Sequence, residues 1–323
     1  MKSVSHEDML FEELYQVVRA RFHVELRHVE QIKRGWLNRK WKIETHEGTY
    51  LLKQYNQDRL KKYSIDELHH VFSEQNRLHS LGFPCPKIFS DEDEVFFETL
   101  SGERFIMMEF CSGQLMKPGK LTDEQMFQLG YYTGKMHAFL NDGKTPTKKN
   151  PMFVPPSKDE RMGYWKKVLN EVSLAGKYEL SPIIEKQLQL MEVFQMDQLN
   201  LKSVGWAHRD LWVDNMLFQE NQLSAILDFD RLNYDHLLLD VGRAIISGAL
   251  DGDSLHVKGI KSFVQGYSLF RPTGEKFIAD ALKLLWYLES EWWLDVQMDQ
   301  RKGPPIRFVQ EMIWLSEHLL ELC

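Results

Sequence analysis

The stretch HRDLWVDN at residues 208–215, followed by ILDFD at residues 226–230, decides how this chain is interpreted. Both motifs lie beside short apolar runs, which predicts polar loops next to strands. Such a loop can aim the Asp210 carboxylate at a substrate and the Asn215 amide oxygen at a metal ion. Asp228 on the following strand adds a second hard oxygen ligand of the type that Mg²⁺ prefers. The spacing therefore predicts phosphoryl transfer, which needs a proton acceptor, metal ligands and fixed geometry.

Each of these side chains, taken singly, has a simpler interpretation as an ordinary polar loop residue. Four such residues occur together at this spacing and lie between two apolar runs: His208, Asp210, Asn215 and Asp228. The combination favours the catalytic interpretation over the simpler one.

The overall composition is typical of a globular intracellular protein. The chain has 323 residues, of which 43% are hydrophobic, enough for two lobes. Its formal net charge of −7 gives no general attraction to nucleic acid or to an anionic membrane. Three scattered cysteines, an acidic amino-terminal segment and no long apolar run lead us to expect a soluble cytoplasmic protein without disulfides or membrane spans.

Hydrophobic periodicity divides the chain into a mainly β part and a mainly α part. Before residue 110 it predicts a helix ending near residue 22, a helix over 64–81, and strands over 23–32, 39–45, 48–55, 94–100 and 104–110. After it, helices are predicted over 122–140, 157–174, 182–197, 254–269, 273–298 and 304–322. This order indicates an α+β protein with an N-lobe at 1–110 and a C-lobe at 111–323.

The two motifs resemble those of a known superfamily. HRDLWVDN matches the H-R-D-L-x-x-x-N catalytic loop of protein kinases, but DFD stands where they have D-F-G, and neither A-P-E nor G-x-G-x-x-G is present. The pair is more similar to the aminoglycoside phosphotransferase superfamily, which includes choline kinases, methylthioribose kinases and type II homoserine kinases. The resemblance covers roughly residues 25–295. It implies a two-lobed protein-kinase-like fold, with a small antiparallel β-sheet N-lobe and a mainly α-helical C-lobe, and the use of ATP and Mg²⁺.

In the C-lobe the resemblance implies a role for each motif residue. Asp210 corresponds to the catalytic base. Asn215 and Asp228 correspond to the magnesium ligands. His208 is expected to support the loop by hydrogen bonding, and Asp240 corresponds to an aspartate that braces the loop from the next helix.

In the N-lobe the resemblance implies a phosphate-binding lysine. Lys53, at the end of the run YLLK, corresponds to the strand lysine that holds the α- and β-phosphates of the nucleotide. Glu74 corresponds to the glutamate that pairs with this lysine, and Glu67 is a rival partner. A lysine at the end of a strand is otherwise an ordinary surface residue.

Three further nucleotide contacts and one loop residue follow from the same resemblance. Gly35 falls where the family has its phosphate-covering loop. Glu109 and Cys111 fall in the interlobe hinge, whose backbone groups contact the purine. Asp230 either assists the metal or fixes the loop.

The substrate is expected to be a small alcohol that also carries an amine. Trp286, Glu289 and Trp293 share one helical face, which can bind a cationic amine through cation–π and ion-pair contacts. The alternative is that this aromatic stripe is core packing. The catalytic loop also resembles that of type II homoserine kinases. Homoserine, an aminoglycoside and a choline-like amine are therefore all open.

Two other functional classes compete with this interpretation. The first is a non-catalytic kinase-like binding protein, for instance on a spore coat. The second is a protein kinase, which the short sequence after Asp228 disfavours because it has no room for an activation loop. Nothing in the sequence sets the oligomeric state.

Overall fold

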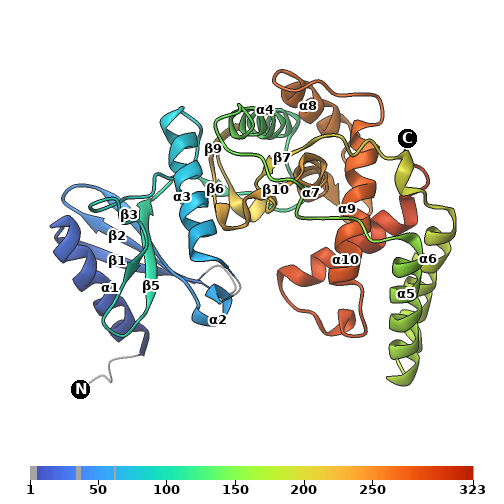
Figure 1. The fold of residues 1–323 in the computed structure, drawn as a ribbon, viewed down its shortest axis with the longest axis horizontal. Helices are drawn as coiled ribbons and strands as arrows, with labels where there is room; N and C mark the ends of the chain where they lie inside the picture. Colours follow the sequence, from blue (N-terminus) through green and yellow to red (C-terminus); the bar gives the residue numbers. More distant parts are fainter. Residues whose placement is uncertain (1–5, 34–37, 62, 323) are drawn as a thin grey trace. The chain divides into compact units, whose positions relative to one another are not determined.

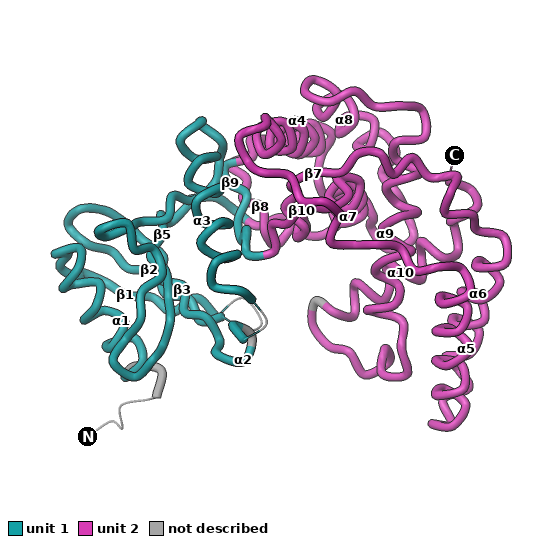
Figure 2. Tube along the Cα trace, in the orientation of Figure 1, with its two compact units in different colours: residues 1–114, 224–230 teal, residues 115–223, 231–323 magenta. Residues whose placement is uncertain are grey.

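The structure, a computed structural model, describes residues 6–33, 38–61 and 63–322 (Figure 1). The contacts group the chain into two compact units, residues 1–114 with 224–230 and residues 115–223 with 231–323 (Figure 2). The segment 224–230, which contains the DFD motif, thus packs with the amino-terminal part although it lies over a hundred residues later. The functional division into lobes at residues 110 and 111 stays a prediction.

An antiparallel sheet forms the centre of the first unit. Its strand order is β1-β2-β3-β5-β4. The strands are β1 (Leu26–Ile32), β2 (Arg39–Thr45), β3 (Thr49–Gln54), β4 (Phe97–Glu98) and β5 (Arg104–Glu109), and the helices are α1 (His6–Phe22), α2 (Gln57–Leu60) and α3 (Ile65–Ser80). Helix α1 packs Leu14 and Val18 against Ile43 and Leu52 of the sheet, all fully buried.

Helices dominate the second unit. They are α4 (Asp123–Leu140), α5 (Lys158–Leu174), α6 (Ser181–Val193), α7 (Leu237–Ala249), α8 (Val257–Ser268), α9 (Phe277–Trp293) and α10 (Pro304–His318). Residues 208–215 connect strand β7 (Val204–Ala207) to strand β8 (Met216–Gln219), and they end in the 3₁₀ turn η3 (Val213–Asn215). Strand β7 pairs with β10 (Asn233–His236).

The remaining short strands are β6 (Gln114–Leu115), β9 (Gln222–Ile226), β11 (Leu250–Asp251) and β12 (Ser254–Leu255), and the remaining 3₁₀ turns are η1 (Tyr178–Leu180), η2 (Met196–Gln198), η4 (Phe229–Arg231) and η5 (Met298–Gln300). The order β6-β8-β9 forms a three-stranded sheet. The first motif therefore begins directly after β7, and the second begins at the last residue of β9, as their apolar flanks predicted.

The expected α+β class, with an antiparallel amino-terminal sheet and a mainly helical carboxyl-terminal part, is confirmed. The periodicity did not predict α7, all 13 of whose residues are buried; its polar residues Asp240, Arg243 and Ser247 share one face, but the run around them is short and mainly apolar. The strand predicted over 94–100 is shorter in the structure, because only Phe97 and Glu98 (β4) pair with the neighbouring strand β5. Among the described residues, no helix is both long and apolar enough to cross a membrane.

Candidate active site

The loop at residues 208–215 brings two of the predicted site residues into contact. The Asn215 amide nitrogen donates hydrogen bonds to the Asp210 backbone oxygen at 2.9 Å and to its carboxylate Oδ2 at 2.8 Å. The Asp210 side chain keeps 26% of its surface exposed. Leu211 and Val213 of the same loop are fully buried, so their side chains fix the loop to the protein interior. The loop thus holds one partly exposed carboxylate against one amide.

The backbone of this loop is strained at Arg209, whose φ is +65°, a value that residues with a side chain rarely adopt. Asp240 on α7 accepts the His208 N–H with Oδ2 and the Arg209 N–H with Oδ1, each at 2.7 Å. The Arg209 side chain donates to the buried Asp235 at 2.8 Å. The two carboxylates together hold the residue in this conformation, next to Asp210 in the chain.

Asp240 is itself held by a fully buried histidine. His137 on α4 lies with Nε2 3.0 Å from Asp240 Oδ2, and its Nδ1 lies 3.0 Å from the hydroxyl of Tyr267 on α8. Burial alone would raise the pKa of Asp240, but the bond to His137 and nearby positive charge hold that pKa below its usual value. The carboxylate therefore stays ionised and can accept both backbone N–H groups.

Close packing of α4 on α8 makes the contact between His137 and Tyr267 possible. A Cβ atom added at Gly130 would lie 2.0 Å from the Phe263 backbone oxygen, and one added at Gly134 would lie 2.7 Å from that of Tyr267. Only glycine allows the backbones of the two helices to approach so closely. These glycines, on the same face as His137, thus set the position of the loop's support.

A second cluster of charges lies around Lys53 on β3. Its ammonium group donates to Asp228 Oδ1 at 2.7 Å and to Asp230 Oδ2 at 2.8 Å, and the Tyr55 hydroxyl donates to Asp230 Oδ1 at 2.9 Å. Lys53 is 3% exposed. Burial alone would lower the pKa of Lys53, but Asp228 and Asp230 outweigh burial and raise that pKa above its usual value. Lys53 is therefore a charged, buried anchor of the DFD segment.

The structure contradicts the predicted pairing of Lys53 with Glu74. Glu74 on α3 accepts two hydrogen bonds from Arg77, at 2.9 and 2.7 Å, one helical turn along the same helix. Among the described residues, Lys53 bonds the two aspartates and neither Glu74 nor Glu67. The DFD segment brings two carboxylates directly to the ammonium group, and they take the place expected for the glutamate.

Comparison with known proteins decides the family. The sequence model of the phosphotransferase enzyme family, APH, matches residues 28–272, about three quarters of the chain. This chain belongs to that family. It is a phosphotransferase, as the motifs at residues 208–215 and 226–230 predicted.

Curated relatives of this phosphotransferase include a protein named homoserine kinase from Rhodopseudomonas palustris (strain BisA53). It is 28% identical over 264 residues, which cover 81% of this chain and 76% of the relative. A second homoserine kinase, from Bradyrhizobium sp. (strain BTAi1 / ATCC BAA-1182), is 25% identical and covers 87% of this chain and 81% of its own length.

Solved structures show the same fold at low identity. Amicoumacin kinase hAmiN, in complex with AMP-PNP, Ca²⁺ and Ami, superimposes with a TM-score of 0.62 at 16% identity, covering 97% of this chain and 96% of its own. Choline kinase from Cryptosporidium parvum Iowa II gives a TM-score of 0.61 at 16% identity, covering 96% and 95%. The protein-kinase-like fold of this phosphotransferase is thereby confirmed.

The predicted nucleotide contacts outside the two clusters lie as follows. Gly35 falls outside the described residues. Glu109 closes β5 with its side chain exposed, and its backbone N–H donates to Lys87 O at 2.8 Å. Cys111 follows it, half-buried, and burial raises the pKa of its thiol to about 12. The hinge role of these two residues in the phosphotransferase stays a prediction.

The aromatic face of α9 is packed inside this phosphotransferase. Trp286 has no exposed surface, and its indole N–H donates to Gln187 at 2.9 Å. A side chain without exposed surface cannot touch a substrate, so the substrate role predicted for Trp286 is wrong and the core-packing alternative holds for it.

The negative charge of Glu289 is already balanced by a neighbouring arginine. It is 7% exposed and forms a buried ion pair with Arg243, which also pairs with Glu311. Burial alone would lower the pKa of Arg243, but the two glutamates raise it. The Trp293 indole donates to Glu289 at 3.1 Å. In this phosphotransferase the carboxylate of Glu289 is thus matched by a guanidinium, which weakens the prediction that it binds a cationic amine.

Three residues that the sequence motifs did not mark lie beside the catalytic loop. His137 and Tyr267 support Asp240, and no local pattern marks them because their partners lie far away in the chain. Arg231 lies with Nη1 3.7 Å from Asp210 Oδ1. Its place directly after the DFD motif was the signal that could have drawn attention to it.

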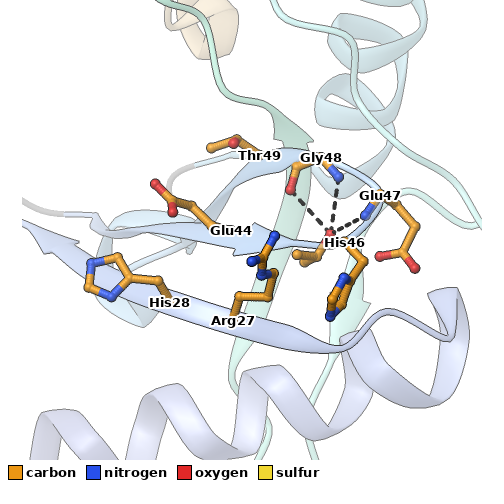
Figure 3. A pocket seen from close by; sticks show the side chains of 8 residues that line it. Arg27, His28, Glu44, His46, Glu47, Gly48 and Thr49 are labelled. Carbon is orange, nitrogen blue, oxygen red and sulfur yellow. Dashed lines mark hydrogen bonds between the residues drawn. The ribbon is translucent and has the colours of Figure 1, made fainter.

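A cavity of about 540 Å³ at the turn between β2 and β3 lies away from the predicted chemistry (Figure 3). It is lined by Arg27, His28 and residues 44–49. The Thr45 hydroxyl accepts the backbone N–H groups of Glu47 and Gly48 at 3.1 and 3.2 Å and so shapes the turn. This turn is at the opposite end of β3 from Lys53, so we assign the cavity no part in the phosphotransferase site.

Proposed function

We propose that this phosphotransferase is a cytoplasmic kinase that uses ATP and Mg²⁺ to phosphorylate the hydroxyl group of a small substrate bearing an amine. Homoserine is the first candidate. The observation that carries the proposal is the braced loop, which holds a partly exposed Asp210 against Asn215 and is fixed by Asp240.

Asp210 is proposed as the base that accepts the proton of the substrate hydroxyl while the phosphoryl group moves in line. Its carboxylate is oriented by the Asn215 amide, and the neighbouring backbone is held by Asp240. Because this orientation exists before the substrate arrives, little reorganisation is needed during the reaction. Fixed positioning is the main contribution that a protein makes to phosphoryl transfer.

Asn215 and Asp228 are proposed to hold the metal ion. The proposed donors are the amide oxygen of Asn215 and the carboxylate of Asp228, both hard oxygen ligands of the kind that Mg²⁺ prefers. The Asn215 nitrogen is turned toward Asp210, which leaves its amide oxygen, a hard donor, for a cation. When bound, Mg²⁺ neutralises the phosphate oxygens. The two ligands belong to different units, and their convergence is part of the proposal.

Lys53 is proposed to bind the α- and β-phosphates of ATP. The cation is already charged and is positioned by Asp228 and Asp230, so its charge costs nothing further to desolvate when phosphate arrives. The neighbour hAmiN was solved with AMP-PNP and Ca²⁺, which supports the use of a nucleotide and a divalent ion by this fold. The backbone at residues 109–111 is proposed to contact the purine.

Two observations favour homoserine over an aminoglycoside or a choline-like amine. The relatives named homoserine kinase match over 76% or more of their own length in the two cases described above. The acidic side chain expected to attract a cationic amine, Glu289, is buried and paired with Arg243. A polycationic or quaternary amine therefore lacks that partner, whereas a zwitterionic amino acid does not depend on it.

The test is a measurement of ATP consumption by the purified chain with homoserine, choline and a panel of aminoglycosides, with and without Mg²⁺. We expect turnover with homoserine that requires the metal. Asp210→Asn should lower kcat by about 10²-fold or more and leave nucleotide binding nearly intact. Asp197→Asn, the same chemical change at an exposed residue outside both motifs, serves as the control. Full activity of Asp210→Asn would show that the base is misassigned, and no turnover with any alcohol would refute the function.

A further inference from the structure

Arg231 stands beside the proposed catalytic base without a tight partner. It ends the 3₁₀ turn η4 directly after the DFD motif. Its Nη1 lies 3.7 Å from Asp210 Oδ1, beyond hydrogen-bond distance, and 48% of its side chain is exposed. Among the described residues, Asp210 is the only carboxylate within 4 Å of this guanidinium, which forms no hydrogen bond to them. The five N–H donors of the guanidinium thus remain for water or a ligand.

Other arginines in the same unit are engaged in a different way. Arg209 donates to the buried Asp235 at 2.8 Å. Arg243 is bound by both Glu289 and Glu311 and is 6% exposed. These two guanidinium groups are bound to buried carboxylates and expose little surface. Arg231 is accessible and is placed at the group that the proposed chemistry uses.

The chemistry of a guanidinium restricts what it can bind here. Its planar pair of donors matches the two oxygens of a carboxylate or a phosphate, and it repels a quaternary or primary amine. Because the guanidinium and Asp210 are only 3.7 Å apart, a molecule that reaches both must be short. Its hydroxyl and its anionic group can be separated by only a few bonds.

We propose that Arg231 binds the carboxylate of the substrate and so selects a short hydroxy amino acid whose hydroxyl then lies at Asp210. This inference rests on the proposed kinase function and narrows its substrate class. Binding replaces the loose ion pair at 3.7 Å with a hydrogen-bonded pair to the substrate, so no hydrogen bond of the protein is broken. It also explains why a cation stands next to a residue whose task is to accept a proton.

The experiment compares two alcohols that differ only in the carboxylate, homoserine and 3-aminopropanol. Arg231→Ala should raise KM for homoserine by about 10-fold to 100-fold, the effect of losing a hydrogen-bonded charge, and change kcat by only a few fold. With 3-aminopropanol the variant and the unaltered protein should behave alike. Arg231→Lys keeps the positive charge and loses the planar pair of N–H donors, so its KM for homoserine should lie between those of the unaltered protein and Arg231→Ala. The matched control is Arg21→Ala, because Arg21 is a similarly exposed arginine paired with Asp91.

A binding measurement without turnover provides a second readout. 2-Aminobutyrate keeps the carboxylate and the amine of homoserine and lacks the hydroxyl. Calorimetry should show that Arg231→Ala weakens its binding by a factor similar to the change in KM. Unchanged binding and unchanged KM would overturn the inference.

Three other outcomes distinguish an error in the role of Arg231 from an error in the substrate class or in the proposed kinase function. If Arg231→Ala lowers kcat equally with both alcohols, the guanidinium acts on the transferred phosphoryl group, and the carboxylate assignment is overturned. If the unaltered protein phosphorylates alcohols without a carboxylate and no hydroxy acid, the substrate inference fails while the kinase function stands. If no alcohol is phosphorylated, the proposed function fails, and the 2-aminobutyrate measurement still decides whether Arg231 binds a carboxylate.

Discussion

Replacement of Gly130 by alanine tests whether the contact between α4 and α8 is as tight as the structure indicates. The added Cβ would lie 2.0 Å from the Phe263 oxygen, about 1.4 Å short of the 3.4 Å at which ordinary contact begins. The obstacle is backbone, so no side chain can swing aside and the helices must separate. Overpacking of this kind costs about 1–3 kcal/mol, and we expect the upper end of that range. Alanine's higher helix propensity returns about 1 kcal/mol, so the variant should lose about 2 kcal/mol of unfolding free energy.

The matched control is Gly163→Ala on α5, where an added Cβ meets nothing within 4 Å. The chemical change and the gain in helix propensity are the same, so this variant should gain about 0.5–1 kcal/mol. Guanidinium denaturation of both variants gives the two free energies, and the m-value reports whether the compactness of either state has changed. The difference between the variants isolates the packing cost. A Gly130→Ala protein as stable as Gly163→Ala would refute the close approach of α4 to α8.

Three further predictions concern the charged clusters. Tyr267→Phe leaves the buried Nδ1 of His137 without a partner. This variant should lower the unfolding free energy by about 1–3 kcal/mol in urea denaturation. It should also lower kcat, by a larger factor than any change in the KM for ATP. An equal loss of stability with unchanged kcat would make the contact merely structural. Asp240 has a folded pKa below its unfolded value, so its contribution to stability is present above about pH 4 and is lost as the pH falls through the folded pKa. Asp240→Asn should therefore be less stable than the unaltered protein at pH 7, with a gap in melting temperature that narrows on acidification; a constant gap would contradict the assignment. Lys53→Met removes one partner of a largely buried cluster and should cost about 3 kcal/mol or more in denaturant unfolding, and adding Asp230→Asn should recover part of that loss. No recovery in the double variant would mean that the two side chains are not coupled.

Sequence patterns predicted most of the helices and strands, and their failures have a common cause. Helix α4 has polar residues on one side, and its predicted range of 122–140 agrees with Asp123–Leu140. Helix α7 has no exposed residue, and its short, mainly apolar run was not recognised as a helix although Asp240, Arg243 and Ser247 recur in it at helical spacing. The aromatic face of α9 was visible in the sequence, but its burial was not. Periodicity shows which residues share a face, and it does not show what covers that face.

In the candidate site, too, the sequence predicted the local contact and failed for the contact between distant segments. The contact between Asp210 and Asn215 joins residues five positions apart in one loop, so spacing was sufficient to predict it. The partner of Lys53 was predicted as Glu74, which bonds Arg77 on its own helix instead. The choice among several carboxylates depends on which segment the fold brings nearest, and residue type alone does not contain that information.

The amino-acid sequence by itself determined the chemistry of the catalytic loop, the α+β class and the family, because these depend on residue types at short, local spacings. Only the tertiary structure decided that Lys53 binds aspartates 175 and 177 positions away, and that His137 reaches Asp240 across 103 positions. It also decided that Trp286 lies in the core. Contacts at such separations arise from how whole helices and strands pack, since packing sets both burial and the pairing of buried charges.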